Sequence, residues 1–156
     1  MHDVTISELP PKRVAALRHR GDYAEIGATF ERVRRIFDAR GLWAPGQAMI
    51  ALYHDDPAGV PLSELSGHAG VMVGAEALIH ELFDTVVVKG GRHAVLRHEG
   101  SYQGLPGACR YLRETWPGEA GETPDADVPL QEIYLRPPED PQGALTEIHM
   151  ALKPQA

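Results

Sequence analysis

One helical pattern, flanked by strand patterns, organises the first half of the chain. Its apolar residues recur every three or four positions, at Ile26, Phe30, Val33 and Phe37. This is the period of an amphipathic helix, and Gly41 suits the position just after the helix end. Short β-prone segments lie on both sides of the helix, at residues 4–9, 13–19, 48–53 and 68–73. Pro10 and Pro11 interrupt the first two segments as a hairpin connection would, so we expect these two strands to pair.

The second half of the chain carries the same order of patterns. Residues 82–88 and 93–98 are β-prone and are joined through a Lys-Gly-Gly turn, which predicts a second hairpin. A helix follows, with one apolar face at Leu105, Ala108, Leu112 and Trp116. Because proline cannot lie deep inside a helix, Pro106 indicates a later start than in the first half. Two strands end the chain, at residues 130–135 and 145–152.

The two halves are also related in sequence. Residues 13–26 read RVAALRHRGDYAEI and residues 92–105 read RHAVLRHEGSYQGL, with seven of 14 positions identical at an offset of 79. A weaker echo follows at an offset of 81, where Tyr53 aligns with Tyr134 and His68 with His149. The chain therefore looks like two copies of one unit of about 80 residues, as a duplication produces.

The duplication predicts the domain organisation and the fold class. We expect a single domain over residues 1–156, made of two repeats at approximately 1–78 and 79–156. Each repeat is a strand-helix-strand-strand unit, so the class is α+β. We expect a mostly antiparallel sheet with two long helices on one face, the other face free, and a ligand groove at the pseudo-two-fold axis between the repeats.

Charge and cysteine content narrow the class of function. The 15 Lys and Arg residues against 22 Asp and Glu residues give a net charge of −7, which argues against nucleic acid as a direct partner. Cys109 is the single cysteine, so no intramolecular disulfide can form. The N-terminus does not resemble a signal peptide, and no apolar run is long enough to span a membrane. We expect a cytoplasmic protein without a membrane partner or a cofactor.

Four motifs together resemble those of a known family. They are ELPPKRVAALRHRGDY, YHDDP, RHAVLRHEGSY and EIYL, and they extend over about residues 2–153. The chain resembles the GyrI-like small-molecule-binding domain, also described as the bacterial transcription activator effector-binding domain. The resemblance implies a duplicated strand-helix-strand-strand fold with a ligand groove between the halves. It also implies that a buried glutamate, matched here by Glu132, faces cationic aromatic compounds.

The alternation along the last repeat supports a site around Glu132. Glu132 and Tyr134 share one face of their strand, and Ile133 and Leu135 share the other. We expect the apolar pair to pack on the helices and Glu132 to face the groove. Ala51 occupies the equivalent position in the first repeat, which predicts an asymmetric pocket with one acid. The expected ligand-binding residues are Glu132, Tyr134, Tyr53, Trp43, Met49, Ala51 and Tyr102. The alternative is that Glu132 is a solvent-facing strand residue and that the tyrosines are structural caps.

Other polar residues favour structural roles. His19 and His98 occupy the same place in the repeat, just before a glycine turn, so each is expected to make a structural hydrogen bond. Asp55 precedes a proline turn and is expected to cap backbone amides. No metal-ligand motif such as H-E-x-x-H is present, so we expect no metal site. Cys109 has no evident histidine partner, which argues against a catalytic thiol. The acidic stretch at 119–127 is interpreted as a solvated connection.

Three functions are compatible with this pattern, and binding of a small molecule is favoured. The first is a stand-alone effector-binding or multidrug-recognition domain for amphipathic or cationic aromatic ligands. The second, which the resemblance also implies, is a hydrolase of reactive cyclopropane-type genotoxins that would use Glu132, Tyr134 and Tyr53. The third is an interaction protein that modulates gyrase or partners a regulator. A DNA-binding regulator is disfavoured because the sensor-like domain begins within the first few residues.

Overall fold

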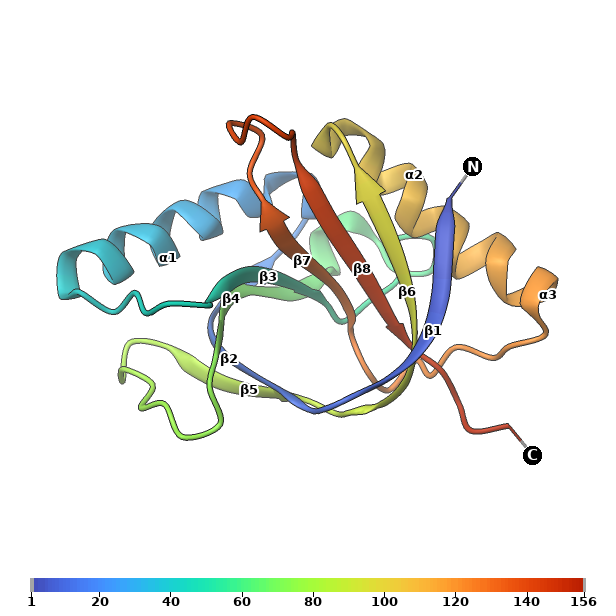
Figure 1. Cartoon of the computed structure of the whole chain (residues 1–156), viewed down its shortest axis with the longest axis horizontal. Coiled ribbons are helices and arrows are strands. Elements are labelled where there is room, and N and C mark those ends of the chain that lie inside the picture. Colours follow the sequence, from blue (N-terminus) through green and yellow to red (C-terminus); the bar gives the residue numbers. More distant parts are fainter. Residues whose placement is uncertain (1, 156) are drawn as a thin grey trace. The chain divides into compact units, whose positions relative to one another are not determined.

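The computed structural model describes residues 2–155, which divide into two compact units. The central unit comprises residues 12–88, and the terminal unit comprises residues 2–11 and 89–155. Each contains four antiparallel strands and a helical segment, so the predicted α+β class and antiparallel pairing are confirmed. Figure 1 colours the chain along its sequence and labels these elements.

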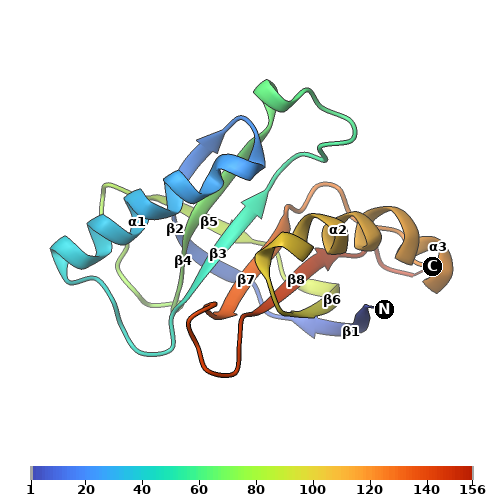
Figure 2. The same cartoon turned by 90° about the horizontal axis from the view of Figure 1, so that it is seen from above.

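The central unit is built around one long helix. Its strands are β2 (Lys12–Arg20), β3 (Ala48–Tyr53), β4 (Ser66–Val73) and β5 (Asp84–Val88), which lie in the order β5-β2-β4-β3. Helix α1 (Ile26–Arg40) packs on β2 and β4 (Figure 2). Of its predicted apolar face, Ile26, Val33 and Phe37 are buried, whereas Phe30 is half-buried and Thr29 is buried in its place. Gly41 ends the helix with φ +61°, as expected of a residue in the left-handed region.

The terminal unit repeats this plan with a more irregular helix. Its strands are β1 (Asp3–Leu9), β6 (Gly91–Glu99), β7 (Leu130–Arg136) and β8 (Leu145–Ala151), in the order β1-β6-β8-β7. The helical segment runs from α2 (Leu105–Arg110) through a π-helical turn at Tyr111–Thr115 to α3 (Trp116–Ala120). The four residues of its predicted apolar face, Leu105, Ala108, Leu112 and Trp116, are all buried.

The start of α2 corrects the prediction made from Pro106. Leu105 begins α2 and Ile26 begins α1, so the two helices start at equivalent positions of the repeat. Proline is tolerated in the first turn because the N–H it lacks has no partner inside the helix there. Pro106 therefore lies inside the first turn and does not delay it.

Neither predicted hairpin forms. β1 pairs with β6 from Asp3↔Arg97 to Leu9↔Gly91, and β5 pairs with β2 from Lys12↔Val88 to Ala16↔Asp84 (Figure 1). Each unit thus takes its outer strand from the other sequence repeat. Two consecutive prolines hold an extended backbone, which carries the chain onward instead of reversing it. The compact units consequently do not coincide with the repeats expected at 1–78 and 79–156.

The link between β1 and β2 passes very close to the link between β5 and β6. A Cβ atom on Gly90 would lie 2.7 Å from the carbonyl oxygen of Leu9 and 2.8 Å from the nitrogen of Pro11. These are backbone atoms, which cannot move aside as a side chain can. Glycine at position 90 is therefore required by the close approach of two backbone segments.

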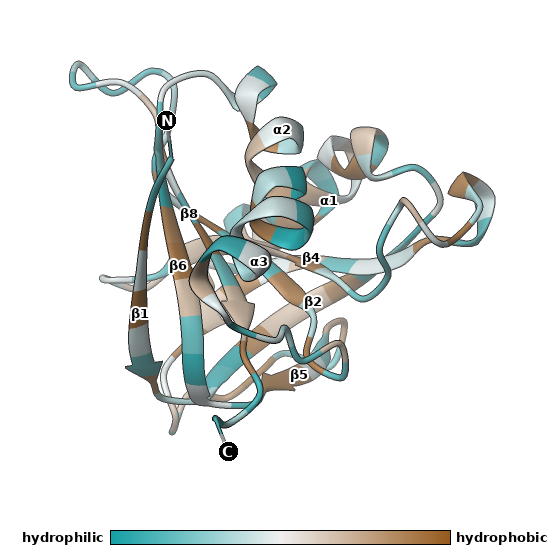
Figure 3. Ribbon diagram, turned by 90° about the vertical axis from the view of Figure 1, so that its right-hand side faces the viewer, coloured by the Kyte–Doolittle hydropathy of each residue, from teal (hydrophilic) through white to brown (hydrophobic). Residues whose placement is uncertain are grey.

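β1 is the outer strand of the terminal sheet, and its polarity matches that place. Figure 3 shows hydrophobic colour along its middle and hydrophilic colour toward its ends. Asp3 and Glu8 are exposed at those ends, whereas Leu9 is half-buried. Charged residues on an outer strand discourage further strand pairing.

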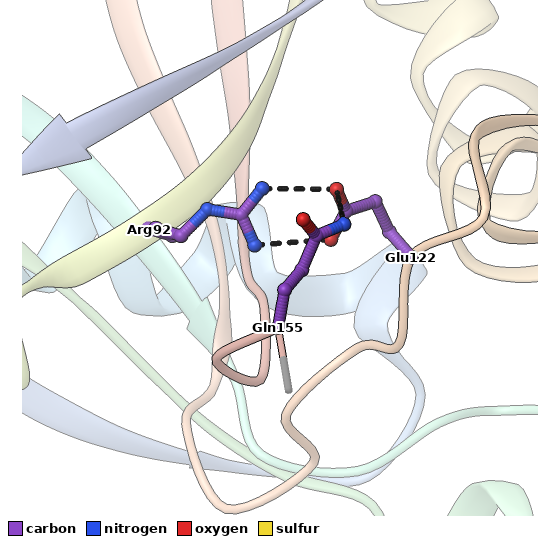
Figure 4. Close-up of polar contacts among 3 residues, drawn as sticks. All are labelled: Arg92, Glu122 and Gln155. Atoms are coloured by element: carbon purple, nitrogen blue, oxygen red, sulfur yellow. Dashed lines mark hydrogen bonds and ion pairs between the residues drawn. The ribbon is translucent and has the colours of Figure 1, made fainter.

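Glu122, in the acidic loop of the terminal unit, forms an ion pair with Arg92 and accepts a hydrogen bond from Gln155 near the end of the chain. Arg92 donates two hydrogen bonds to Glu122, of 3.0 and 2.9 Å, and the Gln155 amide donates a third of 2.9 Å (Figure 4). The Glu122 side chain is 5% exposed, so this part of the stretch at 119–127 is not the solvated connection that the sequence suggested. Hydrogen bonds with the Arg92 guanidinium lower the pKa of Glu122.

Candidate functional site

Glu132 is buried and is held by two hydrogen-bond donors. It lies in β7, where it pairs with Ile148 of β8, and only 4% of it is exposed. The Tyr134 hydroxyl donates to Glu132 Oε1 at 2.7 Å, and the Cys109 thiol donates to Oε2 at 3.1 Å. Each carboxylate oxygen therefore receives one donor. The alternative of a solvent-facing strand residue does not hold for Glu132.

The face of β7 that carries Glu132 is the one covered by the helix. Cys109 belongs to α2, so its contact with Glu132 places Glu132 and Tyr134 on the helix side of the terminal sheet. This corrects the prediction that Ile133 and Leu135 would pack on the helices. The two-residue alternation along β7 is as predicted, but hydrophobicity alone predicts the wrong face for the helix. Ile133 is buried on the opposite face and Leu135 is 44% exposed.

Tyr102 adds an aromatic ring beside this carboxylate. Its ring centroid lies 5.5 Å from that of Tyr134, with the planes tilted by 57°, which is within the range of favourable aromatic pairs. Tyr102 is 39% exposed, whereas Tyr134 is half-buried. The cluster of Glu132, Tyr134, Tyr102 and Cys109, named here the Glu132 cluster, thus connects a buried charge to an accessible aromatic surface within the terminal unit.

Cys109 is the member of the Glu132 cluster that sequence reasoning missed. Burial, followed by the negative charge of Glu132, raises the pKa of the Cys109 thiol far above its ordinary range. The thiol therefore stays protonated and acts as a donor to the carboxylate, which agrees with the prediction against a catalytic thiol. No short motif joins position 109 to position 132, because the contact depends on how α2 lies on the sheet.

Strand register confirms the equivalence of Ala51 and Glu132. Ala51 pairs with Ala69 in β4, as Glu132 pairs with Ile148 in β8. Ala69 and Ile148 in turn face the repeat-related residues Leu17 and Leu96. Ala51 is fully buried, so the central unit has a methyl group where the terminal unit has an acid. The same register overturns the alignment of His68 with His149, because the counterpart of His68 is Glu147.

Tyr53 reproduces the aromatic arrangement of Tyr134 in the central unit. Its ring lies 4.5 Å from that of Tyr23, which is the repeat counterpart of Tyr102. The Tyr23 hydroxyl donates to the backbone carbonyl of Ser66 at 2.5 Å, so Tyr23 anchors the start of β4. A tyrosine pair thus recurs in both repeats, and the pair in the terminal unit adjoins the carboxylate of Glu132.

The remaining two predicted site residues, Trp43 and Met49, contact side chains in the second half of α1. Trp43 is 41% exposed; its ring packs 4.8 Å from that of Phe37 and its indole N–H donates to Asp38 at 2.7 Å. Met49 is half-buried, with its sulfur 3.8 Å from a guanidinium nitrogen of Arg34. The structure therefore joins Glu132, Tyr134 and Tyr102 in one cluster and places Trp43, Met49, Ala51 and Tyr53 in the central unit.

Both repeated histidines make the structural hydrogen bonds that were predicted. His19 Nε2 donates to the Asp22 carbonyl at 3.0 Å, and His98 Nε2 donates to the Ser101 carbonyl at 2.9 Å. Because a carbonyl only accepts, these bonds fix the hydrogen on Nε2. The carboxylate of Asp55 accepts from the backbone N–H and the hydroxyl of Ser66, both at 2.9 Å. Its expected capping role is confirmed.

Two kinds of feature are absent from residues 2–155. They contain no group of three or more His, Cys, Asp and Glu side chains arranged to hold a metal ion. None of the helices among them is both long and apolar enough to cross a membrane.

Comparisons with known proteins agree with this architecture. The chain matches the family model of the GyrI-like small molecule binding domain over residues 2–153. Among solved structures, the C-terminal domain of EcmrR is 18% identical with a TM-score of 0.75, covering 98% of each chain. SAV2435 bound to tetraphenylphosphonium is 13% identical with a TM-score of 0.71, covering 97% of this chain and 94% of that one. A hydrolase from Listeria innocua is 10% identical with a TM-score of 0.60, covering 97% and 92%. At these identities the structures show a shared fold, and the match of the family model over nearly the whole sequence shows that this chain belongs to the GyrI-like small-molecule-binding domain family.

Proposed function

We propose that this domain binds amphipathic cationic aromatic molecules and that Glu132 supplies the counter-charge. The observation that carries the proposal is a carboxylate that is 4% exposed and stands beside two tyrosines. Its donors in the Glu132 cluster include the Tyr134 hydroxyl and the Cys109 thiol. A carboxylate in a buried position attracts a cation more strongly than one in water, because the protein interior screens charge less, so a bound cation is a favourable partner for it.

The tyrosines extend the proposal to aromatic ligands. A cation near the face of a tyrosine ring gains about 0.5–2 kcal/mol, and Tyr102 is exposed enough to meet a ligand. SAV2435, whose fold is similar, has a structure bound to tetraphenylphosphonium, a lipophilic cation with four phenyl rings.

Calorimetric titration with tetraphenylphosphonium tests the role of Glu132. We expect saturable binding to the wild type and at least tenfold weaker binding to Glu132→Gln, which removes the charge and preserves the shape. Tyr134→Phe removes one donor to Glu132 and is expected to cause a smaller loss. Glu139→Gln is the matched control, because Glu139 is an exposed acid of the same unit.

The charge dependence is tested with a neutral ligand of similar shape. Triphenylphosphine oxide is expected to bind weakly to the wild type and equally weakly to Glu132→Gln. Equal affinity of wild type and Glu132→Gln for tetraphenylphosphonium would refute the proposed counter-charge. Absence of saturable binding to the folded wild type would refute this ligand class.

Hydrolysis is the second candidate function, and one observation favours it. Tyr134 O–H lies 2.7 Å from Glu132, which pairs a proton donor with a carboxylate as acid–base chemistry requires. Against it, the Tyr134 hydroxyl and the Cys109 thiol already occupy one acceptor site on each carboxylate oxygen, which leaves fewer sites for a water molecule. Mass spectrometry of a cyclopropane-bearing electrophile incubated with the protein separates the two functions, because binding alone leaves the compound intact.

The proposed cellular location and class of partner rest on the net charge and the cysteine content. A net charge of −7 and a single cysteine support a cytoplasmic domain whose partner is a small molecule and not nucleic acid. A protein partner, either a regulator or gyrase, is compatible with a cytoplasmic location, but no surface feature among residues 2–155 supports such a partner.

A further inference from the structure

Two histidines on neighbouring strands of the central unit face each other nitrogen to nitrogen. His68 lies in β4, and His54 follows the last residue of β3. His54 Nε2 and His68 Nδ1 form a hydrogen bond of 2.8 Å, and the rings are nearly perpendicular, at 85° with centroids 5.0 Å apart. Leu52 pairs with His68 across the two strands, so His54, two positions further on, projects to the same side of the sheet.

A carboxylate stands behind one of the two rings. Asp84 Oδ2 of β5 lies 3.6 Å from His68 Nε2, on the side of the ring away from His54. A carboxylate there favours the tautomer with its hydrogen on Nε2, which leaves the Nδ1 lone pair to accept the hydrogen of His54 Nε2. A metal ion between the two nitrogens would replace that hydrogen, and neutral His54 would then carry its hydrogen on Nδ1. Histidines that bind metals are commonly oriented in this way by a carboxylate on the second nitrogen.

We propose that His54 Nε2 and His68 Nδ1 bind a divalent transition-metal ion such as Zn²⁺, with Asp84 orienting His68 and water completing the coordination. Imidazole nitrogens that share a tetrahedral zinc ion at about 2.0–2.1 Å lie about 3.3 Å apart. The present separation of 2.8 Å must therefore widen by only about half an ångström. His54 is exposed, so this movement disturbs no packed core and water can reach the ion.

The charges around the pair suit an exchangeable metal site. Partial burial lowers the pKa of both His54 and His68, in His54 with a further effect from His68 itself, and this direction favours the neutral form of imidazole that binds metals. Arg18 lies close enough to act on both rings and opposes a cation, whereas Asp84 favours it. Asp55 is engaged with Ser66. Two protein ligands beside an arginine make a weaker site than a structural zinc centre. The proposal departs from the expectation of no metal, because residues 54 and 68 become neighbours only through the β3–β4 register.

Titration of Zn²⁺ into the full chain without a purification tag tests the site. We expect one ion per chain at pH 7.5, at least tenfold weaker binding to His54→Ala and to His68→Ala, and a loss of about tenfold or more for Asp84→Asn. His80→Ala is the matched control, because His80 belongs to the same unit and its Nδ1 accepts a backbone hydrogen bond from Leu82. Its affinity should equal that of the wild type. Circular dichroism of each variant shows whether it is folded.

A second readout identifies the nitrogens involved. In ¹⁵N-detected imidazole spectra, Zn²⁺ is expected to shift His54 Nε2 and His68 Nδ1 while leaving the resonances of His80 unchanged. Absence of saturable Zn²⁺ binding to the wild type would overturn the proposal. Equal binding by folded His54→Ala, or binding without a shift at either nitrogen, would overturn it as well.

Discussion

At the scale of single residues, the terminal unit holds two shielded carboxylates in different surroundings. Glu122 receives the Arg92 guanidinium through two hydrogen bonds and the Gln155 amide through a third. These contacts connect segments that lie far apart in the sequence, which is a structural role. Glu132 receives the Tyr134 hydroxyl and the Cys109 thiol, and Tyr134 in turn packs against the exposed ring of Tyr102. An accessible aromatic ring next to the carboxylate therefore distinguishes the proposed binding acid from Glu122 more clearly than burial does.

The Arg92–Glu122 pair predicts acid sensitivity of the fold. Because the pKa of Glu122 is lower in the folded state than in the unfolded chain, its contribution to stability is complete above the unfolded pKa, about 4.3. That contribution is lost as the pH falls through the lower folded pKa. Urea unfolding of wild type and Glu122→Gln from pH 7 to pH 3 should show the wild type more stable at pH 7 and a difference that shrinks below about pH 4.3. A difference that is constant over this range would contradict the assignment.

At the scale of elements, regular patterns were predictable and their pairing was not. The four-residue apolar face of the second helix and the equivalence of Ala51 with Glu132 follow from periods of 3.6 and 2, which are local properties of the chain. The pairing of β1 with β6 and of β5 with β2 joins strands far apart in the sequence. Local patterns do not predict it, because β1 or β5 could supply the backbone hydrogen bonds that β2 and β6 each need. The sequence likewise predicts a site at Glu132 but not the contribution of Cys109, and it predicts the wrong face of β7 for the helix. Those features depend on how separate elements pack.

Gly90 lies where the link between β5 and β6 passes the link between β1 and β2. Gly90→Ala would place a Cβ against the backbone of Leu9 and Pro11, and overpacking of this kind costs about 1–3 kcal/mol. Gly27→Ala is the matched control, because Gly27 is exposed in α1 and a Cβ there meets no atom within 4 Å. The control should be stabilised by about 0.5–1 kcal/mol. Chemical denaturation measures the free energy of unfolding of both variants. An unchanged midpoint for Gly90→Ala would show that the backbone segments at Gly90 and at Leu9–Pro11 can move apart without a loss of stability.

At the scale of the whole molecule, folding units and sequence repeats have different boundaries. The repeat suggests a division near residue 78, but the strand pairing places the central unit at residues 12–88. A chain of residues 1–78 would contain β1 without its partner β6 and β2 without its partner β5. A chain of residues 12–88 keeps the pairings β5-β2, β2-β4 and β4-β3 together with α1. The two fragments are of nearly equal length, so comparing them isolates the effect of the outer strand.

We therefore expect fragment 12–88 to be the more structured of the two. Its far-UV circular dichroism should show helix and strand content with a cooperative thermal transition, because each of its strands has a partner and the buried face of α1 has its sheet. Fragment 1–78 should show less signal and a broad transition, since β2 would lose the hydrogen bonds of one entire edge. Adding residues 79–88 to fragment 1–78 supplies β5 and should restore cooperativity, although β1 still lacks β6. Equal cooperativity of fragments 1–78 and 12–88 would show that β1 can replace β5 beside β2, as the hairpin predicted from the sequence requires.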